Sequence, residues 1–108
     1  MALHHVKAGE IARLSPLGED LRNIRTYALV KTNCFEAARL NIPAGTKIAE
    51  HAVEGPVTLH CLEGKFILTR KAGDITMQAD DWLHMEPGEP HALEAIEDTS
   101  VLVTIIFP

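Results

Sequence analysis

Turn-forming residues divide this chain into short segments, and their spacing limits the possible folds more than any other feature of the sequence. Seven glycines and six prolines are spread along the 108 residues. Between the turns lie short runs of apolar and β-branched residues, at 26–31, 34–42, 57–62, 65–70, 75–79, 82–85, 91–96 and 101–107. Several short strands at close spacing are typical of a β-sandwich or a β-barrel. The pattern therefore predicts a mostly β protein.

Helical patterns are weak in this chain. Residues 19–25 place acidic side chains first and arginines last, which favours a single helical turn near the N-terminus. Residues 34–42 contain strong helix formers. We nevertheless expect a strand there, because Pro43 and Gly45 follow directly and the neighbouring runs have strand character. Gly73 lies between two such runs and predicts a hairpin turn, since glycine adopts positive φ without strain.

The composition indicates one ordinary globular domain. Hydrophobic residues make up 46% of the chain and charged residues 23%, which excludes a disordered or fibrous chain. A length of 108 residues fits a single domain over 1–108. The formal net charge of −5, without any basic run, argues against partners such as nucleic acid or anionic membranes.

The sequence also indicates where the protein is located and the state of its two cysteines. No apolar stretch approaches the ~20 residues that a membrane-spanning helix needs, and the first residues lack the pattern of a secretory signal. We therefore expect a cytoplasmic protein. Cys34 and Cys61 do not form a CxxC pair, so we expect reduced thiols that serve as small buried hydrophobic side chains. His4 and His5 are expected in a flexible tail.

Two segments, 43–70 and 79–95, carry a recognisable set of glycines and histidines. In the first, five residues separate Gly45 from His51, and Gly64 follows. In the second, two residues separate Gly88 from His91. These residues resemble the two motifs of the cupin superfamily, G-x5-H-x-H-x3-4-E-x6-G and G-x5-P-x-G-x2-H-x3-N. The short spacer between the motifs is similar to that of small single-domain bacterial cupins of the RmlC-like type.

The resemblance implies a particular all-β architecture. Cupins fold as a double-stranded β-helix, which is a jelly-roll barrel. For this chain we expect the barrel core at about 35–107 and an N-terminal arm or strand over 1–25, with at most a short helical turn.

Several motif positions depart from the family pattern. The second histidine of the first motif falls on Val53, and the glutamate falls on Val57 or Thr58. Of the four positions that hold a metal in the family, His51 and His91 therefore remain. In the second motif other residues replace the first glycine, the proline and the asparagine, at Asp80, Glu86 and Ala95.

A metal site thus needs further ligands from elsewhere in the chain. The resemblance implies a divalent transition metal, Ni, Zn, Fe or Mn, held by His51 and His91. His60 and Glu54 are the candidates for a third ligand. If Val57 faces inward, strand alternation turns His60 to the other face unless a bulge intervenes. Glu54 follows His51 by three residues in a loop.

The apolar replacements suggest a different use of the barrel. Inward alternation from Val57 places Leu59 and Cys61 on the same side, and Phe66 follows on the next run. These side chains, with Leu68, predict an apolar cavity that has His51 and His91 as its polar groups, a composition typical of ligand pockets.

Three functions are compatible with this sequence. The first is a small-molecule-binding cupin with a partial metal site. The second is a metal-dependent cupin enzyme, a dioxygenase or an isomerase, that uses His51 and His91. The third is a structural or sensory module that acts through its dimer face. The sequence does not identify the ligand or decide between catalysis and binding.

A homodimer is expected from the outer faces of the sheets. Residues 101–107 are apolar on both faces, which fits a strand with one face in the core and the other at a subunit contact. Trp82 and His84 are placed on one face of their strand, opposite Leu83 and Met85, and are expected at a surface or dimer contact.

Overall fold

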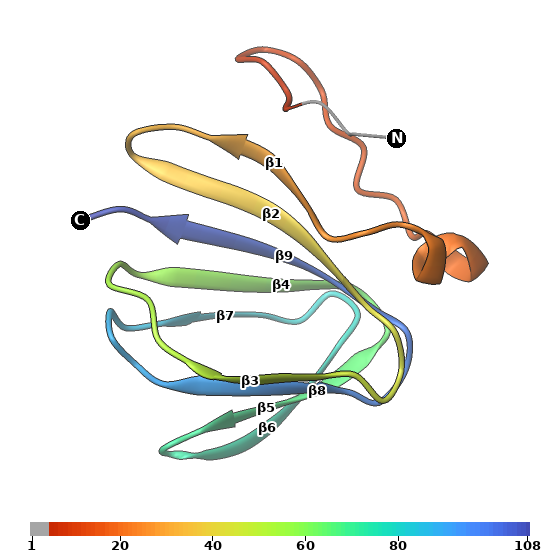
Figure 1. The fold of residues 1–108 in the computed structure, drawn as a ribbon, viewed down its shortest axis with the longest axis vertical. Helices are drawn as coiled ribbons and strands as arrows, with labels where there is room; N and C mark the ends of the chain where they lie inside the picture. Colours follow the sequence, from red (N-terminus) through yellow and green to blue (C-terminus); the bar gives the residue numbers. More distant parts are fainter. Residues whose placement is uncertain (1–4) are drawn as a thin grey trace.

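The computed structural model describes residues 5–108, so the prediction for His4 lies outside the described residues. Within that range the chain forms nine strands and one short 3-10 helix, as Figure 1 shows. The helix η1 spans Gly18–Asn23, and the strands are β1 (Tyr27–Lys31), β2 (Phe35–Ile42), β3 (Lys47–His51), β4 (Val57–Glu63), β5 (Lys65–Arg70), β6 (Gly73–Gln78), β7 (Trp82–Met85), β8 (His91–Ala95) and β9 (Thr99–Ile106).

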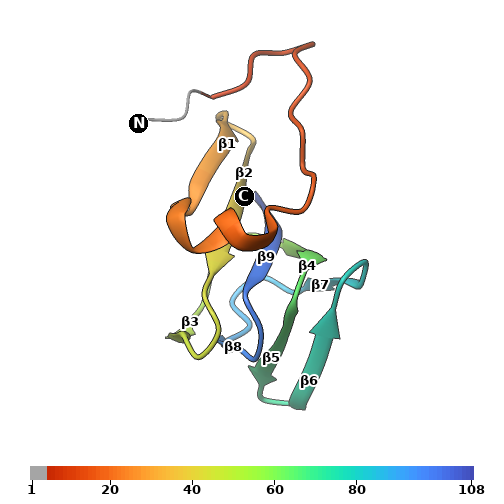
Figure 2. The ribbon, with the colours of Figure 1, turned by 90° about the vertical axis from the view of Figure 1, so that its right-hand side faces the viewer.

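The strands form two antiparallel sheets. One sheet has the order β1-β2-β9-β4-β7 and the other the order β3-β8-β5-β6. Figure 1 and Figure 2 both place β1 and β2 at one end of the molecule and β5 and β6 at the other. Apart from the hairpins β1-β2 and β5-β6, neighbouring strands are distant in sequence, which is the arrangement of a jelly roll. The expected all-β jelly roll is confirmed.

The strand expected at 34–42 is confirmed, despite its helix-forming residues. It is β2, which pairs with β1 on one side and with β9 along its whole length on the other. Pairing on both sides supplies backbone hydrogen bonds that outweigh a weak local preference for helix. The expected helical turn is also present, as the 3-10 helix η1. Gly73 has a positive φ of 125° at the hairpin between β5 and β6, as expected.

One strand, β3, was not expected from the sequence. Its residues Lys47–His51 are mostly exposed and polar, so they lack the apolar alternation that marks a strand. β3 is an edge strand that pairs with β8 alone, and that pairing defines it. β9 also begins two residues before the expected apolar run, at Thr99, because Thr99 and Ser100 are buried and pair with β2 or β4.

The core lies between the two sheets and is built by strand alternation. On β4 the buried side chains are Val57, Leu59 and Cys61, as expected, and the residues between them are half-buried on the outer face. On β5 the buried side chains are Phe66 and Leu68. Gly64, at the tight turn between these strands, has a positive φ of 87° and lies against the backbone of Asp98 and Thr99, so a side chain there would collide.

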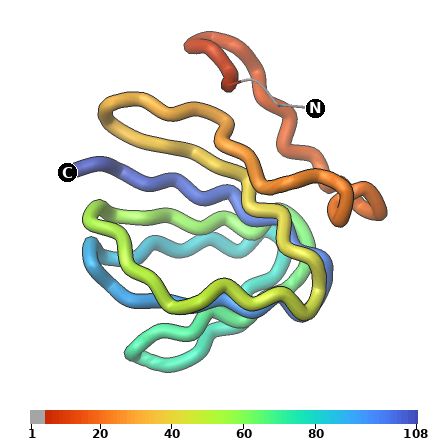
Figure 3. Tube along the Cα trace, in the orientation of Figure 1, coloured from red at the N-terminus to blue at the C-terminus, as the bar shows by residue number. Residues whose placement is uncertain are grey.

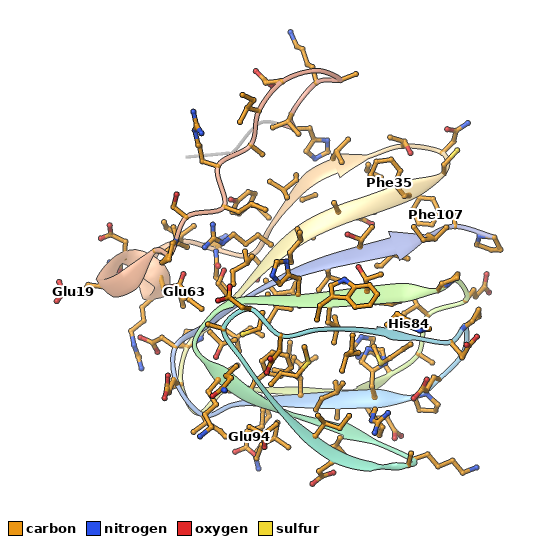
Figure 4. The ribbon with its side chains drawn as sticks, turned by 180° about the vertical axis from the view of Figure 1, so that it is seen from behind. Glu19, Phe35, Glu63, His84, Glu94 and Phe107 are labelled. Carbon is orange, nitrogen blue, oxygen red and sulfur yellow. The ribbon has the colours of Figure 1, made fainter. Side chains whose placement is uncertain are left out.

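An N-terminal arm, defined as residues 5–26, packs against the five-stranded sheet. The Glu63 carboxylate accepts backbone hydrogen bonds from Leu17 and Gly18, at 2.6 and 3.1 Å. The buried Arg39 pairs with Glu63 at 3.2 Å and also donates to the carbonyl of Ser15. Figure 4 shows Glu63 beside η1. These bonds anchor the arm to β2 and β4.

Among residues 5–108, no helix combines the length and the apolar character that crossing a bilayer requires.

Candidate functional site

The two motif histidines lie at the same end of the jelly roll. His51 is the last residue of β3, and His91 is the first residue of β8. The loop from β3 to β4 and the loop from β7 to β8 lie close together at this end, which is the left side of Figure 3. The Gly88 backbone amide donates to the Val53 carbonyl at 2.7 Å and ties these loops together.

A cavity of about 130 Å³ opens at this end, between the sheets. Among residues 5–108, the lining side chains are Leu40, Ile48, His51, Val53, Val57, Leu59, His91, Leu93, Val103 and Ile105. Four of the residues predicted for the pocket are therefore brought together, namely His51, Val57, Leu59 and His91. Val53 lines the cavity as well, so the positions that carry metal ligands in the resembled family face this space with two imidazoles and two valines.

The two imidazoles are in direct contact. His51 and His91 are opposite each other in the β3–β8 register, and their ring centroids lie 4.3 Å apart at an interplanar angle of 61°. His91 is 6% exposed, whereas His51 is exposed at the rim. One ring is thus held in the protein and the other faces the entrance.

The backbone orients both rings in the same way. Nδ1 of His51 lies 3.1 Å from the carbonyl oxygen of Ala49, and Nδ1 of His91 lies 3.1 Å from that of Glu89. A carbonyl oxygen only accepts, so each Nδ1 carries the proton and donates it. The Nε2 atoms are then left for a ligand. A neutral ring accepts a hydrogen bond there, and a protonated ring donates one.

A bulge in β3 explains how His51 reaches the cavity. Ile48 pairs with Leu93, and His51 pairs with His91, so β3 has one residue more than β8 between these pairs. Simple alternation would turn Ile48 and His51 to opposite faces, because they are three residues apart. The extra residue returns both side chains to the same face, and both line the cavity.

The other two predicted pocket residues lie deeper. Cys61 and Phe66 are fully buried in the core with Leu68 and do not line the cavity. Cys61 is two positions further along β4 than Leu59, toward the closed end of the barrel. Burial raises the pKa of the Cys61 thiol to about 11, and its Sγ donates to the Glu63 carbonyl at 3.4 Å. The thiol is therefore protonated at neutral pH and serves as a small core side chain, as expected. The same expectation is wrong for Cys34, which is exposed.

The two candidates for a third metal ligand do not approach the cavity. His60 lies on the outer face of β4, half-buried, where it pairs with Trp82 of β7. No bulge interrupts β4 between Val57 and His60 in its pairing with β7, so the alternation that turns His60 away from Val57 holds. Glu54 is exposed in the loop after β3.

The donor set does not fit a transition-metal centre. Such ions are bound by three or four nitrogen, oxygen or sulfur ligands that converge on one point. In the part of the chain that the structure describes, no three His, Cys, Asp or Glu side chains are grouped so that they could hold an ion. His51 and His91 have the apolar Val53 and Val57 as their neighbours in the lining.

Several lining residues were missed by sequence reasoning. Leu40, Leu93, Val103 and Ile105 come from β2, β8 and β9, the strands that enclose the cavity with β3 and β4. The position of Leu93 could have been predicted, because it follows His91 by two positions and shares its face. The position of Ile48 could not, since it depends on the bulge in β3.

Comparison with known proteins identifies the family. Residues 38–107 match the family model described as a cupin domain. The search of curated proteins found no match.

Similar solved structures include a conserved protein of unknown function from Streptococcus pyogenes, with 19% identity, a TM-score of 0.76 and coverage of 100% of this chain and 98% of that chain. A cupin superfamily protein from Desulfitobacterium hafniense has 15% identity and a TM-score of 0.75, over 89% of this chain and 97% of that chain. A predicted oxalate decarboxylase from Thermotoga maritima has 24% identity and a TM-score of 0.70, over 77% of this chain and 79% of that chain.

At these identities the structural matches establish the fold alone. The family match extends over more than half of the chain and includes both histidines of the cavity. This chain therefore belongs to the cupin superfamily, as a small cupin domain.

Proposed function

We propose that this protein binds a small molecule in the cavity between its sheets, with His51 and His91 as the polar contacts. The observation that carries the proposal is the pairing of two imidazoles, 4.3 Å apart, inside an otherwise apolar lining. Apolar walls with a few placed polar groups are the usual composition of ligand pockets. Because backbone carbonyls occupy both Nδ1 atoms, both Nε2 atoms are left to contact the ligand.

The cavity favours a compact ligand. Its volume of about 130 Å³ is below the ~300–1,000 Å³ of pockets that hold drug-sized molecules. The ligand that fits has few heavy atoms, an apolar body for Leu40, Leu59 and Leu93, and an oxygen or nitrogen group for the imidazoles.

The proposal is a binding function rather than a metal-dependent dioxygenase or isomerase activity. Two imidazoles beside Val53 and Val57 supply too few donors for the metal that such an activity needs. Metal analysis of untagged protein, purified without chelator, checks this point. We expect Ni, Zn, Fe and Mn each well below one ion per chain. A stoichiometric ion that is lost in both His51→Ala and His91→Ala would favour the enzyme instead.

A thermal-shift screen tests the binding function, with a library of small fragments of fewer than about twelve heavy atoms as probes. At a concentration ten times its Kd, a fragment that binds the folded state adds about 1.4 kcal/mol and raises Tm by about 6 °C. Val53→Phe places a large side chain in the cavity lining and should abolish these shifts. Ala52→Phe is the matched control, because it adds the same ring at an exposed neighbouring position.

The two variants separate the possible outcomes. Shifts that vanish in Val53→Phe and persist in Ala52→Phe support binding in the cavity. Shifts that persist in both variants would place the binding elsewhere on the protein and contradict the proposal.

A further inference from the structure

Three nitrogen-bearing side chains lie in one row across the four-stranded sheet. His51 of β3 is opposite His91 of β8, and His91 is in turn opposite Arg70 of β5. Residues directly opposite in antiparallel strands share a face, with Cβ atoms about 4.5–5.5 Å apart. Arg70 also follows Phe66 and Leu68 at two-residue intervals, and both of these are fully buried on the inner face. Arg70 therefore lies beside His91 on the inner face of the sheet, one strand beyond the residues that line the cavity.

The Arg70 guanidinium has no counter-ion within residues 5–108. Its Nε is buried and lacks a hydrogen-bond partner in that range. No salt bridge joins it to a described carboxylate. Glu89, the half-buried carboxylate of the adjacent β7–β8 loop, is already used, since its Oε1 accepts from the backbone amide of Glu86 at 3.2 Å.

The side chains from the facing sheet do not supply a negative charge either. At the same end of the barrel, β4 and β7 contribute the paired residues Val57 and Met85, which are both buried and apolar. A guanidinium nitrogen that is withdrawn from water without a partner is unfavourable, because a buried donor loses its hydration and gains nothing in return. A ligand that supplied the missing acceptor would remove this penalty.

We infer that the ligand of this cavity carries a carboxylate, which Arg70 binds beside His91. This inference rests on the proposed binding function and specifies the class of ligand. The planar guanidinium matches the geometry of a carboxylate and donates to both of its oxygens. The apolar remainder of the ligand then lies against Ile48, Leu59 and Leu93 in the cavity.

The cavity distinguishes this ligand from a free inorganic anion. Arg70 lies beside the lining and can contact only the charged group, whereas the lining beyond the two imidazoles is apolar and stabilises a hydrocarbon group that phosphate and sulfate lack. The predicted class is therefore a small monocarboxylic acid with a compact aliphatic or aromatic body.

Paired probes test the inference. Butyrate and benzoate are compared with butyramide and benzamide, which have the same shape without the charge, and with inorganic phosphate. Backbone amide NMR titrations give the Kd of each probe. We expect each acid to bind at least tenfold more tightly than its amide, because charge-assisted hydrogen bonds are about twice as strong as neutral ones.

Variants assign this preference to Arg70. Arg70→Gln should bring acids and amides to equal affinity, and Arg70→Lys should retain part of the difference, because it keeps the charge and loses the planar fork. Lys71→Gln is the matched control. It removes a positive charge from the exposed neighbouring residue and should leave the preference intact. Circular dichroism shows whether each variant is folded. If Arg70→Gln does not fold, the acid-to-amide affinity ratio of Arg70→Lys serves as the test instead.

The outcomes separate this inference from the proposed function. Equal affinities for acids and amides in the natural protein would overturn the carboxylate and leave the cavity as a binding site. Phosphate binding as tight as that of butyrate would also overturn it. If neither acids nor amides bind, the proposed function fails with the inference.

Discussion

At the level of single residues, two valines account for the difference between this cavity and the metal site of the resembled family. Val53 and Val57 occupy the motif positions where the family has a histidine and a glutamate, and both line the cavity with His51 and His91. Valine in place of histidine and glutamate removes two metal-binding side chains, although the backbone still places these positions at the cavity. The motif spacing was therefore sufficient to locate these four positions at the cavity and to show that two of them lack a metal-binding side chain.

The depth of the cavity was not predictable from the same residues. Alternation places Val57, Leu59 and Cys61 on one face, but it does not show where the facing sheet closes on them. The structure shows that the sheets meet around Cys61, Phe66 and Leu68, which are fully buried. The inner end of the cavity is set by packing between strands that are distant in sequence. The pattern of apolar residues within one strand does not predict it.

Asp80 replaces a motif glycine and keeps the backbone conformation that the glycine would adopt. It occupies the position of the first glycine in the second motif, and its φ is 76°. Glycine adopts this left-handed conformation without strain, and aspartate is among the few other residues that tolerate it. The backbone shape that the motif requires is thus retained without the glycine.

Cys61 gives a residue-level prediction about pH. Burial raises its pKa from 9.0 to about 11, so the folded state holds the thiol proton more tightly than the unfolded state. The stability from this group is fully present below pH 9 and is lost as the pH rises toward 11, by about 2 kcal/mol. Chemical denaturation between pH 8 and 11 measures the loss.

A variant without the thiol isolates this contribution. Cys61→Ala should lose less stability over the same pH range than the natural protein, although it starts less stable because of the small void. Identical pH slopes for the two proteins would show that Cys61 does not titrate differently on folding.

At the scale of secondary structure, sequence patterns predict the strands whose own residues alternate between buried and exposed. The apolar runs at 65–70 and 82–85 coincide with β5 and β7, because buried alternating strands carry their pattern in their own residues. β3 was missed, since its exposed residues are ordered by pairing with β8 and by a bulge. His51 belongs to that strand, so the element hardest to predict holds one of the two imidazoles.

The arm depends on one buried ion pair. Glu63 accepts from the backbone of Leu17 and Gly18 and pairs with Arg39, which is almost fully buried. Glu63→Gln removes the charge and leaves Arg39 buried without its counter-ion, which should lower the free energy of unfolding by about 2–4 kcal/mol. Urea denaturation measures the loss, and hydrogen exchange should show faster exchange at Leu17 and Gly18.

A second carboxylate on a strand serves as the control for this prediction. Glu94 is exposed on β8, and Glu94→Gln should change stability by less than about 0.5 kcal/mol. If both variants are equally stable, the Arg39–Glu63 pair does not anchor the arm.

At the scale of the whole molecule, we propose a homodimer that forms through the outer face of the five-stranded sheet. Trp82 of β7 is 57% exposed there, and its ring lies 6.0 Å from that of His84. Ile106 of β9 is also exposed, whereas Leu102 on the same strand is half-buried. Exposed aromatic residues are enriched at protein interfaces, which supports this face as the contact.

Light scattering coupled to size exclusion tests the dimer at micromolar concentration. We expect a mass of about twice the 11.9 kDa of the chain, and Trp82→Ser should shift it toward the monomer. Ile96→Ser removes an exposed apolar side chain that lies outside this face, after β8, and should leave the mass unchanged. A monomer in the natural protein would refute the proposal.

The most direct test of the central claim is a methyl-resolved NMR titration with the fragments that raise Tm. The account predicts that the methyl signals of Leu40, Ile48 and Leu93 shift together with the ring signals of His51 and His91. Shifts confined to Leu102 and Ile106 on the outer face would contradict it, because the bound molecule would then lie outside the cavity.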